Sequence, residues 1–206
     1  MELFRPVGLA ELRLIYEADM RMFPPRLPDQ PIFYPVLNAQ YARQISHDWN
    51  ARSEEQAGYV TQFEIDDTYA ARFEERTVGG REHLELWVPA DELTEFNQHL
   101  LGPVALISAS FGEGFQGEIP ASFTLQGKTA PEQLDMLGQI LEYNGVDFLL
   151  ELRTNHTAIF LNYPYWAVGP VPPGLEPARR DTILQAIRRG WPTERPALMR
   201  TDAIAA

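Results

Sequence analysis

Residues 81–89 read REHLELWVP, and this stretch organises the prediction of the fold. Side chains of a β-strand point to opposite faces in turn, so alternation places Leu84, Leu86 and Val88 on one face. The same alternation places His83, Glu85 and Trp87 on the other face. The first set is typical of a strand face packed on a core. The second set fits either a solvent-facing strand surface or the wall of a cleft.

Composition predicts a globular protein that folds on its own. The chain has 206 residues, of which 45% are hydrophobic, 11% aromatic and 22% charged. These values are close to the average for globular proteins, and the length allows one domain or slightly more. No apolar run approaches the length of a membrane span, and the N-terminal residues lack the unbroken apolar core of a signal peptide. We therefore expect no membrane association.

The net charge disfavours several kinds of binding partner, and the lack of cysteine excludes several kinds of chemistry. Seventeen basic against 29 acidic side chains give a formal net charge of -12, which disfavours nucleic acid and anionic membranes as partners. The chain has no cysteine, so it can form no disulfide, thiolate nucleophile or cysteine-based metal site. These features are typical of a protein of the reducing cytoplasm, and we expect that location.

Apolar periodicity and Pro/Gly punctuation predict alternating strands and helices before residue 115. Arg5 closes the first predicted strand, and a loop with four prolines occupies residues 23–31. The predicted strands are residues 3–5, 32–34, 60–65, 81–89 and 104–110, and the predicted helices are residues 9–22, 38–49 and 91–100.

The last third of the chain is predicted to form a βαββ arrangement followed by a helix. The predicted strands are residues 122–125, 148–152 and 156–166, and the predicted helices are residues 131–143 and 176–189. We accordingly divide the chain into residues 1–115, a C-terminal α+β region at 116–191 that is either separate from or continuous with the first, and a loose tail at 192–206.

Known catalytic and metal-binding motifs do not occur in this sequence. The four histidines lie in no serine-hydrolase or zinc-protease spacing: His47, His83, His99 and His156. The acidic group Glu64, Asp66 and Asp67 has no calcium-loop pattern, so we predict no metal site. His83 alone shares a strand face with another candidate group, Glu85.

Several segments resemble a small bacterial protein family labelled ADP-ribosylation/crystallin. They are LFRPVGLAELRLI at residues 3–15, IFYPVLNAQYARQI at 32–45, VTQFEI at 60–65 and HLELWVPADELTEFNQHL at 83–100. This resemblance extends to about Trp191. Over about the first 110 residues, the chain is also remotely similar to the core of mono-ADP-ribosyltransferases.

The resemblance implies a fold, a substrate and a set of site residues. The fold would be α+β, with split, mostly antiparallel sheets and packed helices. Arg5 would bind NAD, Tyr34 would lie at the nicotinamide pocket, and Glu85 would be the catalytic glutamate, with His83 where many members carry a second glutamate or a glutamine. The protein would transfer ADP-ribose from NAD to an unknown acceptor, or hydrolyse NAD as a side activity, because a carboxylate can stabilise the cationic state formed as nicotinamide leaves.

Two other functions are compatible with the sequence. One is a non-enzymatic protein-binding module, such as an immunity protein, an antitoxin or a regulatory partner, on a transferase-like scaffold. The acidic composition and the aromatic segment YPYW at residues 163–166 favour this function. The other is a hydrolase that uses Glu85 with either His83 or the acidic group Glu64, Asp66 and Asp67. The transferase hypothesis requires the side chains of Arg5, Tyr34 and Glu85 to line one pocket.

Overall fold

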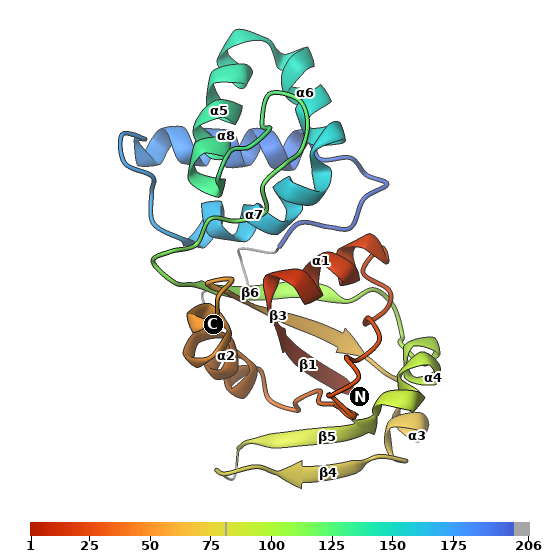
Figure 1. Ribbon diagram of the computed structural model, residues 1–206. Helices are drawn as coiled ribbons and strands as arrows, with labels where there is room; N and C mark the ends of the chain where they lie inside the picture. The colour runs from red at the N-terminus through yellow and green to blue at the C-terminus, as the bar shows by residue number, and fades with distance from the viewer. Residues whose placement is uncertain (81, 200–206) are drawn as a thin grey trace.

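The computed structural model describes residues 1–80 and 82–199, in which two antiparallel sheets are packed with helices (Figure 1). The first sheet has the strand order β1-β3-β6 and the second β2-β5-β4. Their strands are β1 (Glu2–Val7), β2 (Ile32–Phe33), β3 (Ala57–Glu64), β4 (Glu74–Thr77), β5 (Leu84–Pro89) and β6 (Ala105–Phe111). All strand pairs are antiparallel, so the predicted antiparallel α+β character is confirmed.

Val36 connects the two sheets. It forms antiparallel bridges to Phe4 of β1 on one side and to Glu85 of β5 on the other. Its N–H donates to the Phe4 carbonyl at 2.7 Å, and its carbonyl accepts from the Phe4 N–H at 2.8 Å. Residues opposite each other in such a bridge point to the same face, so Phe4, Val36 and Glu85 face the same way.

The two sheets joined through Val36 form one continuous surface. Different helices cover its two faces. The inner face, which carries Leu3, Phe33 and Leu86, belongs to the main core and is covered by α1 (Leu9–Glu17) and α7 (His156–Val168). The outer face carries Phe4 and Val36 and packs against α2 (Ala39–Asp48).

Gly58 of β3 permits the close approach of α2. A Cβ at this position would lie 2.2 Å from the Ser46 carbonyl oxygen, a distance that real Cβ atoms do not tolerate. The backbone of α2 therefore lies against the sheet at a point where only glycine fits.

The C-terminal third is helical, and its predicted strands are wrong. It consists of α5 (Ala130–Tyr143), α6 (Gly145–Thr154), α7 and α8 (Pro177–Gly190), which lie together beyond the first sheet (Figure 1). Residues 148–152 lie within α6, residues 156–166 lie within α7, and residues 122–125 form bends and turns. Every residue from 158 to 166 is buried. A helix buried on all sides has no polar face, so its sequence lacks the helical period and is hard to distinguish from a buried strand.

Smaller departures concern the ends of elements. The helix predicted over residues 9–22 ends at Glu17, because Asp19 and Met20 adopt left-handed φ values of 54° and 55°. The strand β4 was not predicted. The remaining elements are the short helices α3 (Asp67–Ala70) and α4 (Leu93–Gln98) and the 3-10 turns η1 (Asn50–Arg52) and η2 (Ala90–Glu92).

One core joins the two predicted regions. The main cluster of buried apolar residues includes Leu3 and Phe63 from the sheet half together with Leu134 and Trp166 from the helices. Residues 192–199 also pack against it, since Met199 is only 3% exposed, whereas the sequence predicted a loose tail at 192–206. Residues 200–206 of that predicted tail lie outside the described residues.

Candidate functional site

Glu85 is held by two neutral donors on the outer face. The Tyr41 hydroxyl donates to Glu85 Oε1 at 3.1 Å, and the Trp87 indole N–H donates to Oε2 at 3.2 Å. Trp87 reaches it because residues two apart on β5 share a face. Tyr41 is positioned by the start of α2, where the Asn38 side chain caps the helix by accepting from the Tyr41 N–H at 3.2 Å. Both carboxylate oxygens of Glu85 are therefore engaged inside the protein.

Aromatic contacts extend this group to the other predicted residues. The His83 ring stacks on Tyr41 with centroids 4.1 Å apart, and the Tyr34 ring meets Trp87 edge-on at 5.2 Å. We call Tyr34, Tyr41, His83, Glu85 and Trp87 the Glu85 cluster. The structure thus brings together three of the residues predicted from the sequence.

The electrostatics of the Glu85 cluster further favour the protonated form of Tyr41. Burial, together with the neighbouring Glu85 carboxylate, raises the pKa of Tyr41 to about 12. At neutral pH, Tyr41 is a hydrogen-bond donor and cannot act as a base.

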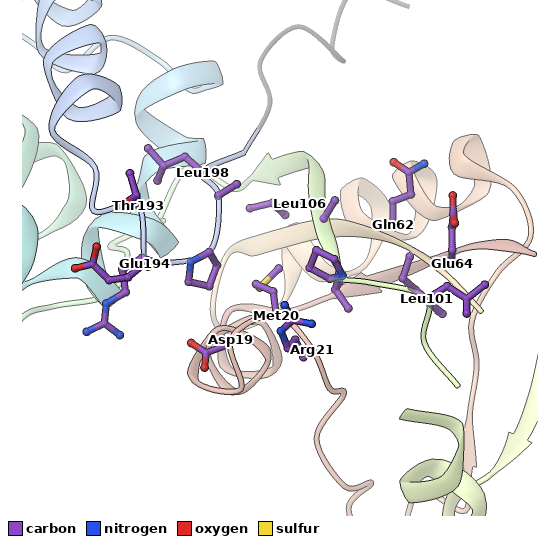
Figure 2. A pocket seen from close by; sticks show the side chains of 17 residues that line it. Asp19, Met20, Arg21, Gln62, Glu64, Leu101, Leu106, Thr193, Glu194 and Leu198 are labelled. Carbon is purple, nitrogen blue, oxygen red and sulfur yellow. The ribbon is translucent and has the colours of Figure 1, made fainter. Parts of the chain in front are cut away.

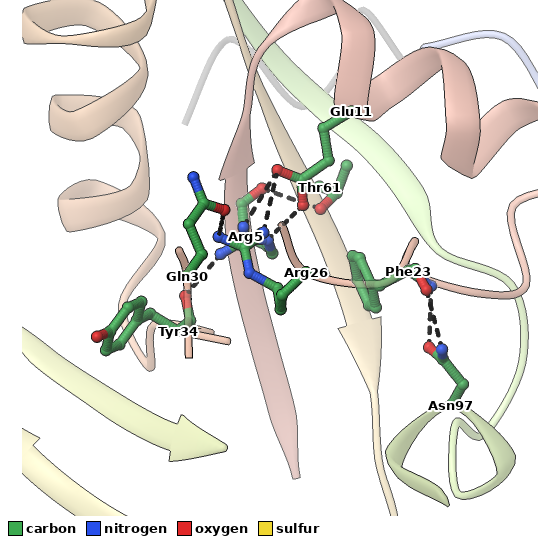
Figure 3. Close-up of polar contacts among 8 residues, drawn as sticks. All are labelled: Arg5, Glu11, Phe23, Arg26, Gln30, Tyr34, Thr61 and Asn97. Carbon is green, nitrogen blue, oxygen red and sulfur yellow. Dashed lines mark hydrogen bonds and ion pairs between the residues drawn. The ribbon is translucent and has the colours of Figure 1, made fainter. Parts of the chain in front are cut away.

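Arg5 lies in a different environment, on the inner face (Figure 3). Its Nε and Nη2 donate to the two carboxylate oxygens of Glu11 at 2.7 and 3.1 Å, and its Nη1 donates to the Tyr34 carbonyl at 3.2 Å. The guanidinium also lies 4.5 Å from the centroid of the Phe33 ring. Arg5 is 7% exposed, so this bidentate ion pair is what permits its burial.

A second arginine shares the Glu11 carboxylate. Arg26 Nη1 lies 3.8 Å from Glu11 Oε2, and Arg26 Nη2 donates to the Gln30 side chain (Figure 3). Burial, and then the charge of Arg5, lower the pKa of Arg26. We call Arg5, Glu11 and Arg26 the Arg5 cluster. Glu11 and Arg26 were not predicted from the sequence, although an acidic residue in the first turn of α1 is a usable signal. The prediction that Arg5 closes the first strand is wrong, because β1 continues to Val7.

Strand alternation separates Arg5 from Glu85. Phe4, Val36 and Glu85 share the outer face, and Arg5 is adjacent to Phe4 in β1, so its side chain points to the inner face. Arg5 meets Tyr34 only through the backbone carbonyl. The cleft described below is lined by other residues, none of them Arg5, Tyr34, His83 or Glu85. The three side chains expected to line one pocket are thus divided between two faces.

Other groups considered in the sequence have local structural roles. Asp66 caps α3 by accepting from the Tyr69 N–H at 2.8 Å. Among residues 1–80 and 82–199, no group of three or more His, Asp or Glu side chains is placed to hold a metal ion. Within the same residues, no helix is both long and apolar enough to cross a membrane.

Comparisons with protein families, with curated proteins and with solved structures find no match to this chain.

Proposed function

We propose that the protein is a non-enzymatic binding module that engages a basic protein through α6 and the end of α5. The observation that carries this proposal is an apolar stripe on the solvent side of these helices. Tyr143 is 86% exposed, Val146 is 73% exposed and Leu150 is 47% exposed. Val146, Leu149 and Leu150 lie on one face of α6, because residues three and four apart are neighbours on a helix.

The opposite face of α6 already packs against the core. Phe148 and Leu152 on that face are 2% and 0% exposed. A helix at the surface of a globular protein needs one apolar stripe, and α6 has two. A contiguous exposed apolar patch is a common mark of a protein interface.

The net charge of the chain favours a basic partner. Next to the stripe, Asp147 is an exposed carboxylate and Arg153 is an exposed basic residue. Glu142 is paired with Arg179 at 3.2 Å. The whole chain carries a formal charge of -12. Electrostatic complementarity increases association rates and disfavours partners of the same sign. We call the surface of Tyr143, Val146, Leu149 and Leu150 the α6 surface.

The engagement of the predicted catalytic groups also supports a binding role. Glu85 accepts a hydrogen bond at each oxygen, and Arg5 is buried against Glu11 on the other face. Catalysis by the predicted residues would require Arg5 to give up Glu11, whereas Glu85 would have to act while holding Tyr41 and Trp87.

Site-specific photo-crosslinking in cells tests the proposal. A photoreactive residue at position 146 is expected to capture one basic protein, and the purified pair is expected to form a stable complex. The double substitution Val146→Asp and Leu150→Asp should abolish the complex, whereas Leu14→Asp, at a residue 50% exposed on α1, should leave it intact. A complex that survives the double substitution would contradict the assignment of this surface.

A second function, an NAD-dependent mono-ADP-ribosyltransferase, is favoured by one observation. Tyr34, His83 and Glu85 lie in one cluster on the outer face, where an aromatic ring could stack on nicotinamide and Glu85 could stabilise the developing positive charge. In this reaction the bond between ribose and nicotinamide breaks, nicotinamide leaves, and the acceptor, or water in a glycohydrolase reaction, bonds to the ribose and loses a proton. Arg5 would have to leave Glu11 to contact the diphosphate.

Release of nicotinamide from NAD by the purified protein tests this second function. Activity should disappear in Glu85→Gln and persist in Glu75→Gln, which alters an exposed glutamate of the neighbouring strand. Absence of both NAD binding and nicotinamide release would exclude the transferase while leaving the binding module unaffected.

A further inference from the structure

The strand β6 has an unpaired edge. It pairs with β3 on one side only, and in the described part of the chain no backbone hydrogen bond reaches its other side over residues 105–111. Just before the strand begins, the Val104 N–H donates to the Met20 carbonyl at 2.6 Å. The backbone of Met20 therefore occupies the position just before β6, and the unpaired edge begins after it.

The side chains of β6 place no charge on that edge, and the pairing of β6 with β3 is irregular at a register shift between Val60 and Thr61. Its sequence, ALISASF, contains no charged residue. By contrast, β4, at the edge of the second sheet, reads EERT and has three charges in four exposed residues. Charged side chains are a usual means of preventing strands from pairing with other chains. The edge of β4 is protected in this way, and the edge of β6 is not.

A cleft of about 760 Å³ lies beside the start of β6. Its walls come from β3 and the start of β6, from the turn at residues 19–21, and from residues 193–198. Figure 2 shows Leu198 facing Leu106 from the other side of the cleft, with Met20 below them. The volume falls in the range of clefts that bind ligands, which is roughly 300–1,000 Å³.

The lining of the cleft suits a peptide better than a ligand of a single charge sign. Met20, Phe63 and Leu106 are apolar. The charged lining residues have both signs: Asp19, Arg21, Glu64, Glu194 and Arg195. Within residues 1–80 and 82–199, none of these five forms an ion pair. A nucleotide or another polyanion would meet three carboxylates here, whereas a peptide offers amides, apolar side chains and charges of both signs.

We propose that an extended segment of a partner protein lies in this cleft and adds to the free edge of β6 as a fourth strand. Main-chain hydrogen bonds to β6 supply affinity in this mode of recognition, and the apolar lining selects alternate side chains. The cleft involves none of the residues of the α6 surface, so the two proposals can fail independently.

The probe is a library of phage-displayed linear peptides of seven residues, the length of β6, selected on the full chain. Selected peptides should slow amide hydrogen exchange in residues 105–111. Methylation of alternate peptide nitrogens should weaken their binding roughly tenfold or more, because it removes the N–H groups that pair with the strand. Failure to select any peptide, or selected peptides that bind elsewhere or tolerate N-methylation, would overturn the proposal.

Matched lysine substitutions locate the site. Ala105→Lys places a charge at the exposed start of β6 and should weaken binding of the selected peptides roughly tenfold. Thr77→Lys makes the same change on the edge strand β4 and should have no effect. Ala197→Lys, on the opposite wall of the cleft, repeats the test if Ala105→Lys disturbs folding as seen by circular dichroism. Unchanged binding in a folded cleft variant would overturn the proposal. A dimer that forms without peptide and protects the β6 amides from exchange would also overturn the proposal, because a second copy of this chain would then occupy the edge of β6.

Discussion

The Arg5 cluster and the Glu85 cluster lie on opposite faces of one surface and stabilise their charges differently. On the inner face, the buried Arg5 guanidinium is paired with the carboxylate of Glu11. On the outer face, the half-buried Glu85 carboxylate accepts hydrogen bonds from the neutral groups of Tyr41 and Trp87. The comparison shows that burial determines the partner: a fully buried charge needs an opposite charge, whereas a partly hydrated one can be held by neutral donors.

The largest predicted effect is that of Glu11→Gln. This change leaves Arg5 buried without an opposite charge, and we expect it to lower the free energy of unfolding by about 3 kcal/mol. Chemical denaturation measures the difference. The control is Glu17→Gln, which breaks the exposed pair with Arg13 and should cost about 0.5 kcal/mol or less. Equal effects of the two changes would mean that burial does not distinguish these ion pairs.

The next effect concerns the helix that covers the outer face. Gly58→Ala forces the new Cβ against the Ser46 backbone, and we expect a loss of about 2 kcal/mol in the free energy of unfolding. Gly145→Ala is the control, because a Cβ at that position meets nothing within 4 Å. Thermal denaturation of both variants provides the measurement. A tolerated Gly58→Ala would show that α2 can move away from β3.

The substitution Glu85→Gln tests the Glu85 cluster directly. The amide can accept from only one of the two donors, Tyr41 or Trp87, so we expect a loss of about 1 kcal/mol in stability. Glu75→Gln, at an exposed position of β4, should change stability by no more than about 0.5 kcal/mol. A loss from Glu85→Gln as large as that from Glu11→Gln would contradict the contrast between the faces.

The last prediction concerns the contribution of Tyr41 to the pH dependence of stability, which changes only above pH 10. The pKa of Tyr41 is about 12 in the folded protein against its ordinary value of 10.0, so the folded state disfavours its ionisation. The contribution of protonated Tyr41 to the free energy of unfolding is complete below pH 10 and is lost as the pH rises towards 12. Tyr41→Phe should therefore lose stability less steeply than the wild type across this interval, in urea titrations at several pH values. Parallel curves for the two proteins would contradict the raised pKa.

The regular, two-sided elements were predictable from the sequence. Alternation in residues 83–88 correctly separated Leu86 and Val88, which are buried, from Glu85 and Trp87, which face the other side. The strand period of two and the amphipathic period of α5 are local properties, so a short window of sequence contains them. The same reasoning failed for α7, whose surroundings are apolar on every side.

Local patterns in the sequence predicted the alternating strands and helices of the first half and the residues of β5 on each face, and composition gave the acidic charge. The folded arrangement was needed to show that Val36 joins the two sheets, that Glu11 pairs with Arg5, and that Arg5 and Glu85 lie on opposite faces. Those relations depend on the register between strands distant in sequence. A one-residue shift in register reverses the face of every side chain, and no local pattern in the chain fixes that register.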